Sequence, residues 1–171
     1  MHPSSRSAIV AAGVVIADQL SKLAVTAWNP SGSDGSPMWS SGILSIFPVE
    51  NGGVIGGVGV ERPDLLPTVA VLALLLLLAL SRRLTVGSTF GAALALAGAA
   101  GNLIDRVRVG HVIDFLAVEL GPAEIVLNLA DVALFIGLPM LALAARGGDG
   151  DRSSPRLGTT SDSALPAYGG S

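Results

Sequence analysis

Four long apolar stretches dominate the pattern of hydrophobic and polar positions along the chain. They lie at residues 8–27, 65–80, 86–104 and 125–144. Because a helix needs roughly 20 residues to cross a bilayer, each stretch predicts a membrane-spanning helix, although the second is slightly short. Pro63 and Pro67 fit the first turn of that second helix, where a missing N–H costs little. The pattern therefore predicts an all-α membrane protein with four transmembrane helices.

The third stretch is rich in small residues at spacings of three and four. They are Gly87, Gly91, Ala95, Gly98 and, at the end of the series, Asn102. This spacing places them on one face of a helix. Small residues on one face let a neighbouring membrane helix approach closely, so we expect this face to pack against another span.

Two segments depart from the helical pattern. Residues 29–63 begin with a Gly/Ser/Pro loop and continue with "ILSIFPVENGGVIGGVGV", which mixes β-branched residues with Gly turns and predicts short strands. Residues 146–171 are polar and rich in Gly, Ser and Pro, and we expect a disordered tail. The predicted organisation is a membrane domain at 1–145, with a small β-rich insert between the first and second helices, followed by this tail.

Composition supports the membrane interpretation and excludes several kinds of chemistry. Half of the residues are apolar and only 13% are charged, whereas soluble domains carry about a quarter. The net charge of −3 does not indicate a nucleic-acid partner. The chain has no cysteine, which excludes disulfides and thiolate nucleophiles, and its two histidines exclude a His-rich metal site. We therefore expect neither a metal nor another cofactor.

The distribution of arginines predicts the orientation in the membrane. If the N-terminus is cytoplasmic, six arginines lie on the cytoplasmic side: Arg6, Arg82, Arg83, Arg146, Arg152 and Arg156. Three lie on the outer side: Arg62, Arg106 and Arg108. This bias agrees with the positive-inside rule. We thus expect both termini in the cytoplasm, with residues 29–63 and 105–124 on the outer side.

Polar residues interrupt the apolar pattern near the outer ends of the helices. Asp18 and Lys22 stand four apart on one face of the first helix, so they can neutralise each other. Asn102, Asp105 and Arg106 share a face at the outer end of the third helix. Ionisable groups at a bilayer are costly, which makes each of these groups a candidate for either structural pairing or function.

Two further acids follow on the same side of the membrane. Asp114 lies among apolar residues in "HVIDFL", and Asp131 stands three residues after Asn128 in "NLADVAL". Asn128 and Asp131 resemble a capping box at a helix start, which does not exclude a role in chemistry. Convergent carboxylates at an outer interface indicate a proton pathway or acid–base chemistry. Two close carboxylates can share one proton and activate a water, as in aspartic peptidases.

Four motifs resemble the bacterial lipoprotein signal peptidase (signal peptidase II) family in their order and placement. They are "DQLSK" (18–22), "NGG" (51–53), "GNLIDR" with "GHVIDF" (101–115) and "NLADVAL" (128–134), and the resemblance covers residues 8–145. The chain differs from the family pattern at Val54, Ile55 and Gly56, where the family usually has Ala-Ala-Phe, and at Leu127, where the family commonly has an aromatic residue. These departures affect the shape of the cleft and leave both aspartates in place.

The resemblance implies a role for each polar group. Asp114 and Asp131 are the expected catalytic dyad. The expected substrate-binding residues are Asn51, Gly53, Asn102, Arg106 and Asn128. The expected supporting residues are Asp18, Lys22 and Asp105. The implied substrate is a prolipoprotein whose Cys carries diacylglycerol, held among membrane lipids and cut on the N-terminal side of that Cys, and we expect the enzyme to be a monomer.

Two alternative functions stay open at this point. A small proton-coupled transporter would use Asp18, Lys22 and Asp105 as a relay, but it needs polar residues through the midplane and the second apolar stretch has none. A noncatalytic membrane assembly factor is disfavoured only by the presence of both dyad residues. Cleavage of a lipidated prolipoprotein by the purified protein would separate these alternatives from a peptidase.

Overall fold

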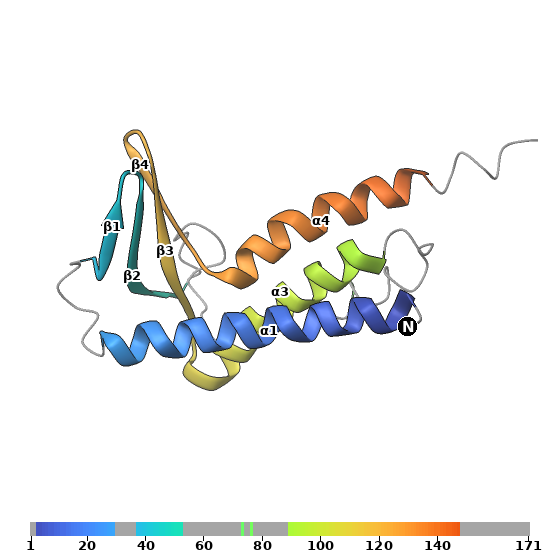
Figure 1. Cartoon of the computed structure of the whole chain (residues 1–171), viewed down its shortest axis with the longest axis horizontal. Coiled ribbons are helices and arrows are strands. Elements are labelled where there is room, and N and C mark those ends of the chain that lie inside the picture. The colour runs from blue at the N-terminus through green and yellow to red at the C-terminus, as the bar shows by residue number, and fades with distance from the viewer. Residues whose placement is uncertain (1–2, 30–36, 53–72, 74–75, 77–88, 148–171) are drawn as a thin grey trace, which may run out of the picture.

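The computed structural model consists of helices packed side by side and a small sheet at one end of them (Figure 1). It describes residues 3–29, 37–52, 73, 76 and 89–147. The helices are α1 (Pro3–Trp28), α3 (Thr89–Val109) and α4 (Leu129–Gly147). The strands are β1 (Trp39–Ser41), β2 (Leu44–Asn51), β3 (Val112–Leu120) and β4 (Ala123–Leu127). Most of the predicted second span, Gly53 to Gly56 and most of the predicted tail lie outside the described residues.

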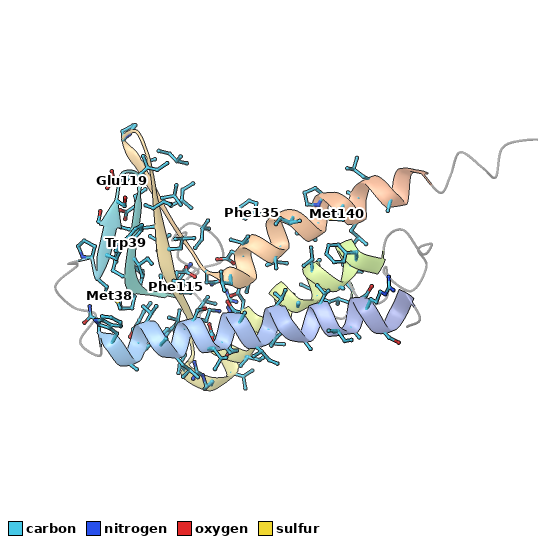
Figure 2. All side chains as sticks on the ribbon, in the orientation of Figure 1. Met38, Trp39, Phe115, Glu119, Phe135 and Met140 are labelled. Atoms are coloured by element: carbon cyan, nitrogen blue, oxygen red, sulfur yellow. The ribbon has the colours of Figure 1, made fainter. Side chains whose placement is uncertain are left out.

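The first predicted helix is confirmed by α1, and the third by α3, which continues five residues beyond its predicted end at residue 104. Within the described residues, the segment Ser5–Trp28 is the one helix with the length and hydropathy needed to cross a membrane, while Leu129–Ala144 forms a shorter apolar helix. Large apolar side chains such as Leu20 on α1 and Phe135 on α4 are about 60% exposed. Phe135 is labelled on α4 in Figure 2. Such surfaces suit contact with lipid chains.

The small residues of α3 pack against α4, as their spacing predicts. A Cβ atom added at Gly91 would lie 2.7 Å from Cβ of Met140, and one added at Gly98 would lie 2.8 Å from Cγ of Leu134. Contacts this short leave no room for a side chain, so glycine allows the two backbones to approach. Close packing of these helices places the C-terminal part of α3 beside the start of α4, where the polar residues gather.

The sheet corrects the all-α prediction. Its four strands are antiparallel in the order β1-β2-β3-β4, whereas the sequence predicted strands only between the first two spans. Residues 112–127 form a second hairpin, and α4 begins at Leu129, not at residue 125. β-Branched and aromatic residues in "VIDFLAV" favour a strand. Gly121, with a φ of 66°, allows the tight turn between β3 and β4.

The register of the sheet brings Asn51 close to Asp114. Asn51 pairs with Val112, and Val49 pairs with Asp114, with an irregularity between Ile46 and Val49. Asn51 and Asp114 are therefore diagonal neighbours on one face of the sheet, a distance that polar side chains can bridge. The last residues of β2 and the first residues of β3 lie at the end of the sheet that is nearest the helices (Figure 1).

Candidate active site

Asp114 is buried and holds two side-chain amides. It lies near the start of β3, where its Oδ2 accepts a hydrogen bond from Nδ2 of Asn51 at 2.8 Å. Its Oδ1 accepts another from Nδ2 of Asn128 at 2.6 Å. Only 2% of Asp114 is exposed. Hydrogen bonds to a carboxylate are among the stronger ones in proteins, so they fix the orientation of this group.

Asp131 lies in the first turn of α4 and forms the capping box that its spacing from Asn128 predicts. The backbone N–H of Asp131 donates to Oδ1 of Asn128 at 2.8 Å, and the N–H of Asn128 donates to Oδ2 of Asp131 at 3.3 Å. The other carboxylate oxygen accepts a hydrogen bond from Nδ2 of Asn102 at 2.7 Å. The capping interpretation is confirmed, and the same bonds aim the carboxylate toward α3.

Asn128 connects the two aspartates directly. Its side chain donates to Asp114, while its backbone N–H donates to Asp131. The side chain is fully buried, and its Nδ2 also lies 3.1 Å from Oδ1 of Asn102. One residue thus holds both carboxylates, so Asp114 on the sheet and Asp131 on the helix converge on the same place.

The surroundings of Asp114 shift its titration toward neutral pH. Burial and, to a smaller extent, the negative charge of Asp131 raise the pKa of Asp114, which lies at about 6 when all effects are combined. Hydrogen bonds from Asn51 and Asn128, together with the positive charge of Lys22, act in the opposite direction. A carboxyl group with this pKa can both hold and release a proton near neutral pH, as general acid–base chemistry requires.

A buried ion triad of Asp18, Lys22 and Asp105 lies next to this pair of aspartates. Nζ of Lys22 is 2.8 Å from Oδ2 of Asp18 and 2.7 Å from Oδ2 of Asp105, and all three side chains are fully buried. The predicted pairing of Asp18 with Lys22 is confirmed, and Asp105 joins it. Nη2 of Arg108 lies 3.6 Å from Oδ1 of Asp105 and forms a second ion pair, in which the arginine side chain is partly exposed.

The triad and the aspartates belong to one hydrogen-bonded network. Lys22 also donates to Oδ1 of Asn102 at 3.2 Å, and Asn102 contacts Asp131. Within the described part of the chain, every buried side-chain nitrogen or oxygen has a hydrogen-bond partner. Buried polar groups that are fully satisfied in this way are rigid and specify one geometry.

The other predicted site residues that the structure describes fall in or beside this network, whereas Gly53 lies outside the described residues. Arg106, half-buried in the last turn of α3, donates from Nη1 to the carbonyl of Asn102 at 3.4 Å. Leu127 is half-buried at the end of β4, directly before Asn128. The amides of Asn102 and Asn128, predicted to orient a peptide, contact the aspartates here.

Gln19 is a residue of the site that the sequence alone did not single out. Its Nε2 lies 3.2 Å from Oδ2 of Asp18, 3.1 Å from Oδ1 of Asp105 and 3.2 Å from the carbonyl of Gly101. Its position in the motif "DQLSK", directly after Asp18, was the one feature of the sequence that could have indicated this contact. The backbone N–H groups of Ile113 and Ala130 also reach the triad, which no sequence pattern indicates.

Comparisons with known proteins agree on one family. Residues 10–146 match the family described as signal peptidase (SPase) II. The lipoprotein signal peptidase of Moorella thermoacetica is 36% identical over 132 residues, covering 75% of this chain and 84% of the relative. That of Synechocystis sp. is 39% identical over 142 residues, covering 80% and 84%.

Two solved structures have a similar fold. Both are described as bacterial membrane enzymes determined by the in meso method. The first, at 2.3 Å resolution, has a TM-score of 0.74 and 24% identity, covering 90% of this chain and 95% of the other. The second, at 1.9 Å resolution, has a TM-score of 0.70 and 26% identity, covering 82% and 92%.

Proposed function

The chain belongs to the signal peptidase II family, and from this premise we propose that it is an aspartic endopeptidase acting on prolipoproteins. Membership identifies it as a protease of lipoprotein maturation. We further propose that the substrate carries diacylglycerol on its Cys and that the bond before this Cys is cut. The relatives named lipoprotein signal peptidase support this substrate class.

The observation that carries the proposed mechanism is the convergence of two carboxylates on one asparagine. Asn128 contacts Asp114 through its side chain at 2.6 Å and Asp131 through its backbone at 3.3 Å. Two carboxylates held this way do not both ionise easily, which favours a form of the pair that shares one proton. A dyad with one proton is the arrangement that hydrolyses peptides in aspartic peptidases.

In the proposed reaction, the dyad accepts one proton from a water molecule and later gives one proton to the leaving amine. The ionised aspartate takes a proton from a water as the water oxygen attacks the carbonyl carbon before the lipidated Cys. The protonated aspartate hydrogen-bonds the carbonyl oxygen and stabilises the negative charge that develops there. When the C–N bond breaks, a proton passes from the dyad to the leaving amine. Asn51 and Arg106 are the residues we assign to binding the peptide backbone beside the dyad.

The membrane setting matches this substrate. The chain is a bacterial membrane protein. We propose four spans, both termini in the cytoplasm and the sheet at the outer face, in agreement with the arginine distribution. The sheet and the start of α4 lie at the same end of the helices (Figure 1). In this orientation the dyad lies at the outer surface, where the signal helix leaves the bilayer and the diacyl chains enter it.

The test is cleavage of a diacylglyceryl-modified prolipoprotein by purified variants, with the released signal peptide detected by mass. We expect Asp114→Asn or Asp131→Asn to lower the rate by on the order of 10³ or more, and the double variant to be little worse. Glu119→Gln, which changes an exposed acid on the same strand as Asp114, is the matched control and should retain activity. Substantial turnover by either dyad variant would refute the assignment.

A further inference from the structure

The two acids of the ion triad do more than neutralise Lys22. Oδ1 of Asp18 accepts a hydrogen bond from the backbone N–H of Ala130 at 2.9 Å. Oδ2 of Asp105 accepts one from the backbone N–H of Ile113 at 3.3 Å. Ala130 directly precedes Asp131, and Ile113 directly precedes Asp114. Each triad acid therefore binds the backbone of the residue before one dyad aspartate.

Lys22 joins these two arms and adds a third. An ammonium group has three donors, and here they lie within reach of Asp18, Asp105 and Asn102. Asn102 in turn donates to the carboxylate of Asp131 at 2.7 Å. Each of these three partners of the Lys22 ammonium group thus leads, through one more hydrogen bond, to a dyad residue or to the residue before it.

We propose that the ion triad positions the catalytic dyad, with Asp18 holding the segment of Asp131 and Asp105 holding the segment of Asp114. The inference rests on the proposed peptidase function for its consequence in catalysis. Asp114 comes from the sheet and Asp131 from α4, which are separate elements that need a common reference. The triad spans α1 and α3 and provides this reference.

The burial of the triad favours positioning over simple support of the helices. A fully buried lysine beside two buried acids concentrates ionisable groups away from water, and burying charges is costly even when they are paired. Well-packed apolar residues would join the helices as well or better. A fixed spacing between two reacting groups is different, because an error of about 1 Å can slow catalysis roughly a hundredfold.

The reciprocal variants Asp18→Ala and Asp105→Ala test the two arms separately. Each removes one acid and leaves Lys22 paired with the other, so neither variant leaves the lysine without a counter-charge. In purified protein we expect amide exchange, followed by NMR, to rise about tenfold or more at Ala130 in Asp18→Ala and at Ile113 in Asp105→Ala. Increases at both amides in both variants, or at neither, would overturn the proposal.

Cleavage kinetics provide the second readout. Both alanine variants should lower kcat about a hundredfold with KM changed less than about threefold, since the geometry of the dyad and not the peptide contacts is altered. Asp18→Asn and Asp105→Asn keep an oxygen acceptor for the backbone N–H and should restore most of the lost kcat. No rescue by asparagine, with the proteins folded, would count against hydrogen bonding to the backbone.

Ser21→Ala is the matched control for the loss of a hydrogen bond in this part of α1. Oγ of Ser21 donates to the backbone carbonyl of Asp18 at 2.8 Å, a contact within α1 that reaches neither a dyad residue nor the residue before it. We expect little change in thermal stability and a kcat within about threefold of wild type. A loss of kcat as large as in Asp18→Ala would overturn the proposal. If the wild type does not cleave the substrate, the proposed function fails, while the exchange measurement still tests the positioning of the two segments.

Discussion

The hydrogen bond from Asn51 to Asp114 should determine where the activity lies on the pH scale. Nδ2 of Asn51 donates to Oδ2 of Asp114 at 2.8 Å. A donor stabilises the ionised carboxylate more than the neutral acid, so this bond lowers the pKa of Asp114 against the effect of burial. Asn51→Leu keeps a side chain of similar size and removes the donor.

The expected shift follows from the strength of the bond. A hydrogen bond to a charged group contributes about 1.5–3 kcal/mol, and 1.36 kcal/mol corresponds to one pKa unit, so its loss should raise the pKa by about one to two units. The bond from Asn128 to the other oxygen remains. We therefore expect a rise of about one unit, from about 6 to about 7.

The direction of the shift does not depend on which aspartate holds the proton. If Asp114 is ionised in the active form, its higher pKa moves the acidic limb of the pH profile upward. If Asp114 is protonated in the active form, the alkaline limb moves upward. Because the two acids interact, the profile reports the pKa values of the pair, and one limb of that profile must shift to higher pH.

The assay is kcat/KM for a lipidated prolipoprotein measured between about pH 4 and 9. Asn51→Leu is expected to lose activity as well, but the position of the limbs is independent of the maximum rate. Glu50→Gln is the matched control, because Glu50 is the neighbouring residue on β2 and its side chain is 81% exposed. A profile that superimposes on the wild type, or moves to lower pH, would refute the reasoning.

Two further predictions concern packing and stability. Gly101→Ala should destabilise the protein by about 1–3 kcal/mol and lower its activity, because the added Cβ would lie 2.7 Å from Oδ2 of Asp18. In the control Gly13→Ala, the added Cβ meets no atom within 4 Å, so we expect neither effect. Thermal unfolding and cleavage assays measure the two effects. The pKa of Asp114 is about 6 in the folded state and 3.8 in the unfolded state, so the folded state binds this proton more tightly. The free energy of unfolding should therefore fall by up to about 3 kcal/mol as the pH rises from below 3.8 to above 6. Unfolding of Asp114→Asn should lack this part of the pH dependence, and an unchanged dependence would contradict the prediction.

Helix positions and one local contact could be predicted from the sequence because they depend on near neighbours. The length of the first apolar stretch predicts α1, and the small residues of the third predict close packing against another helix, which the structure identifies as α4. The capping box between Asn128 and Asp131 depends on a spacing of three residues within one turn. Each of these features follows from local geometry, which a sequence pattern records directly.

The β3–β4 hairpin was missed because its apolar residues also fit a membrane helix. Residues 125–127 are apolar and only Asn128 separates them from the apolar residues at the start of α4, so the pattern extends the predicted helix back to 125. A short apolar run does not distinguish a strand from a helix by periodicity alone. Pairing with β2, which lies more than 60 residues earlier in the chain, determines the strand, and such a partner is not visible locally.

The roles of the asparagines show the same limit within the site. Spacing places Asn102 and Asn128 near the aspartates, and burial requires each amide to find a partner, but neither fact identifies that partner. In the structure both amides contact dyad carboxylates, as Asn51 does. At Asp114, the hydrogen bonds from Asn51 and Asn128 lower the pKa, whereas burial and the charge of Asp131 raise it, and the balance places the pKa at about 6. A site with fewer amide donors would hold Asp114 protonated to higher pH, and one with less burial would keep it ionised. The asparagines therefore keep the pKa of Asp114 close to neutral pH, where the proposed dyad has to take up and release a proton.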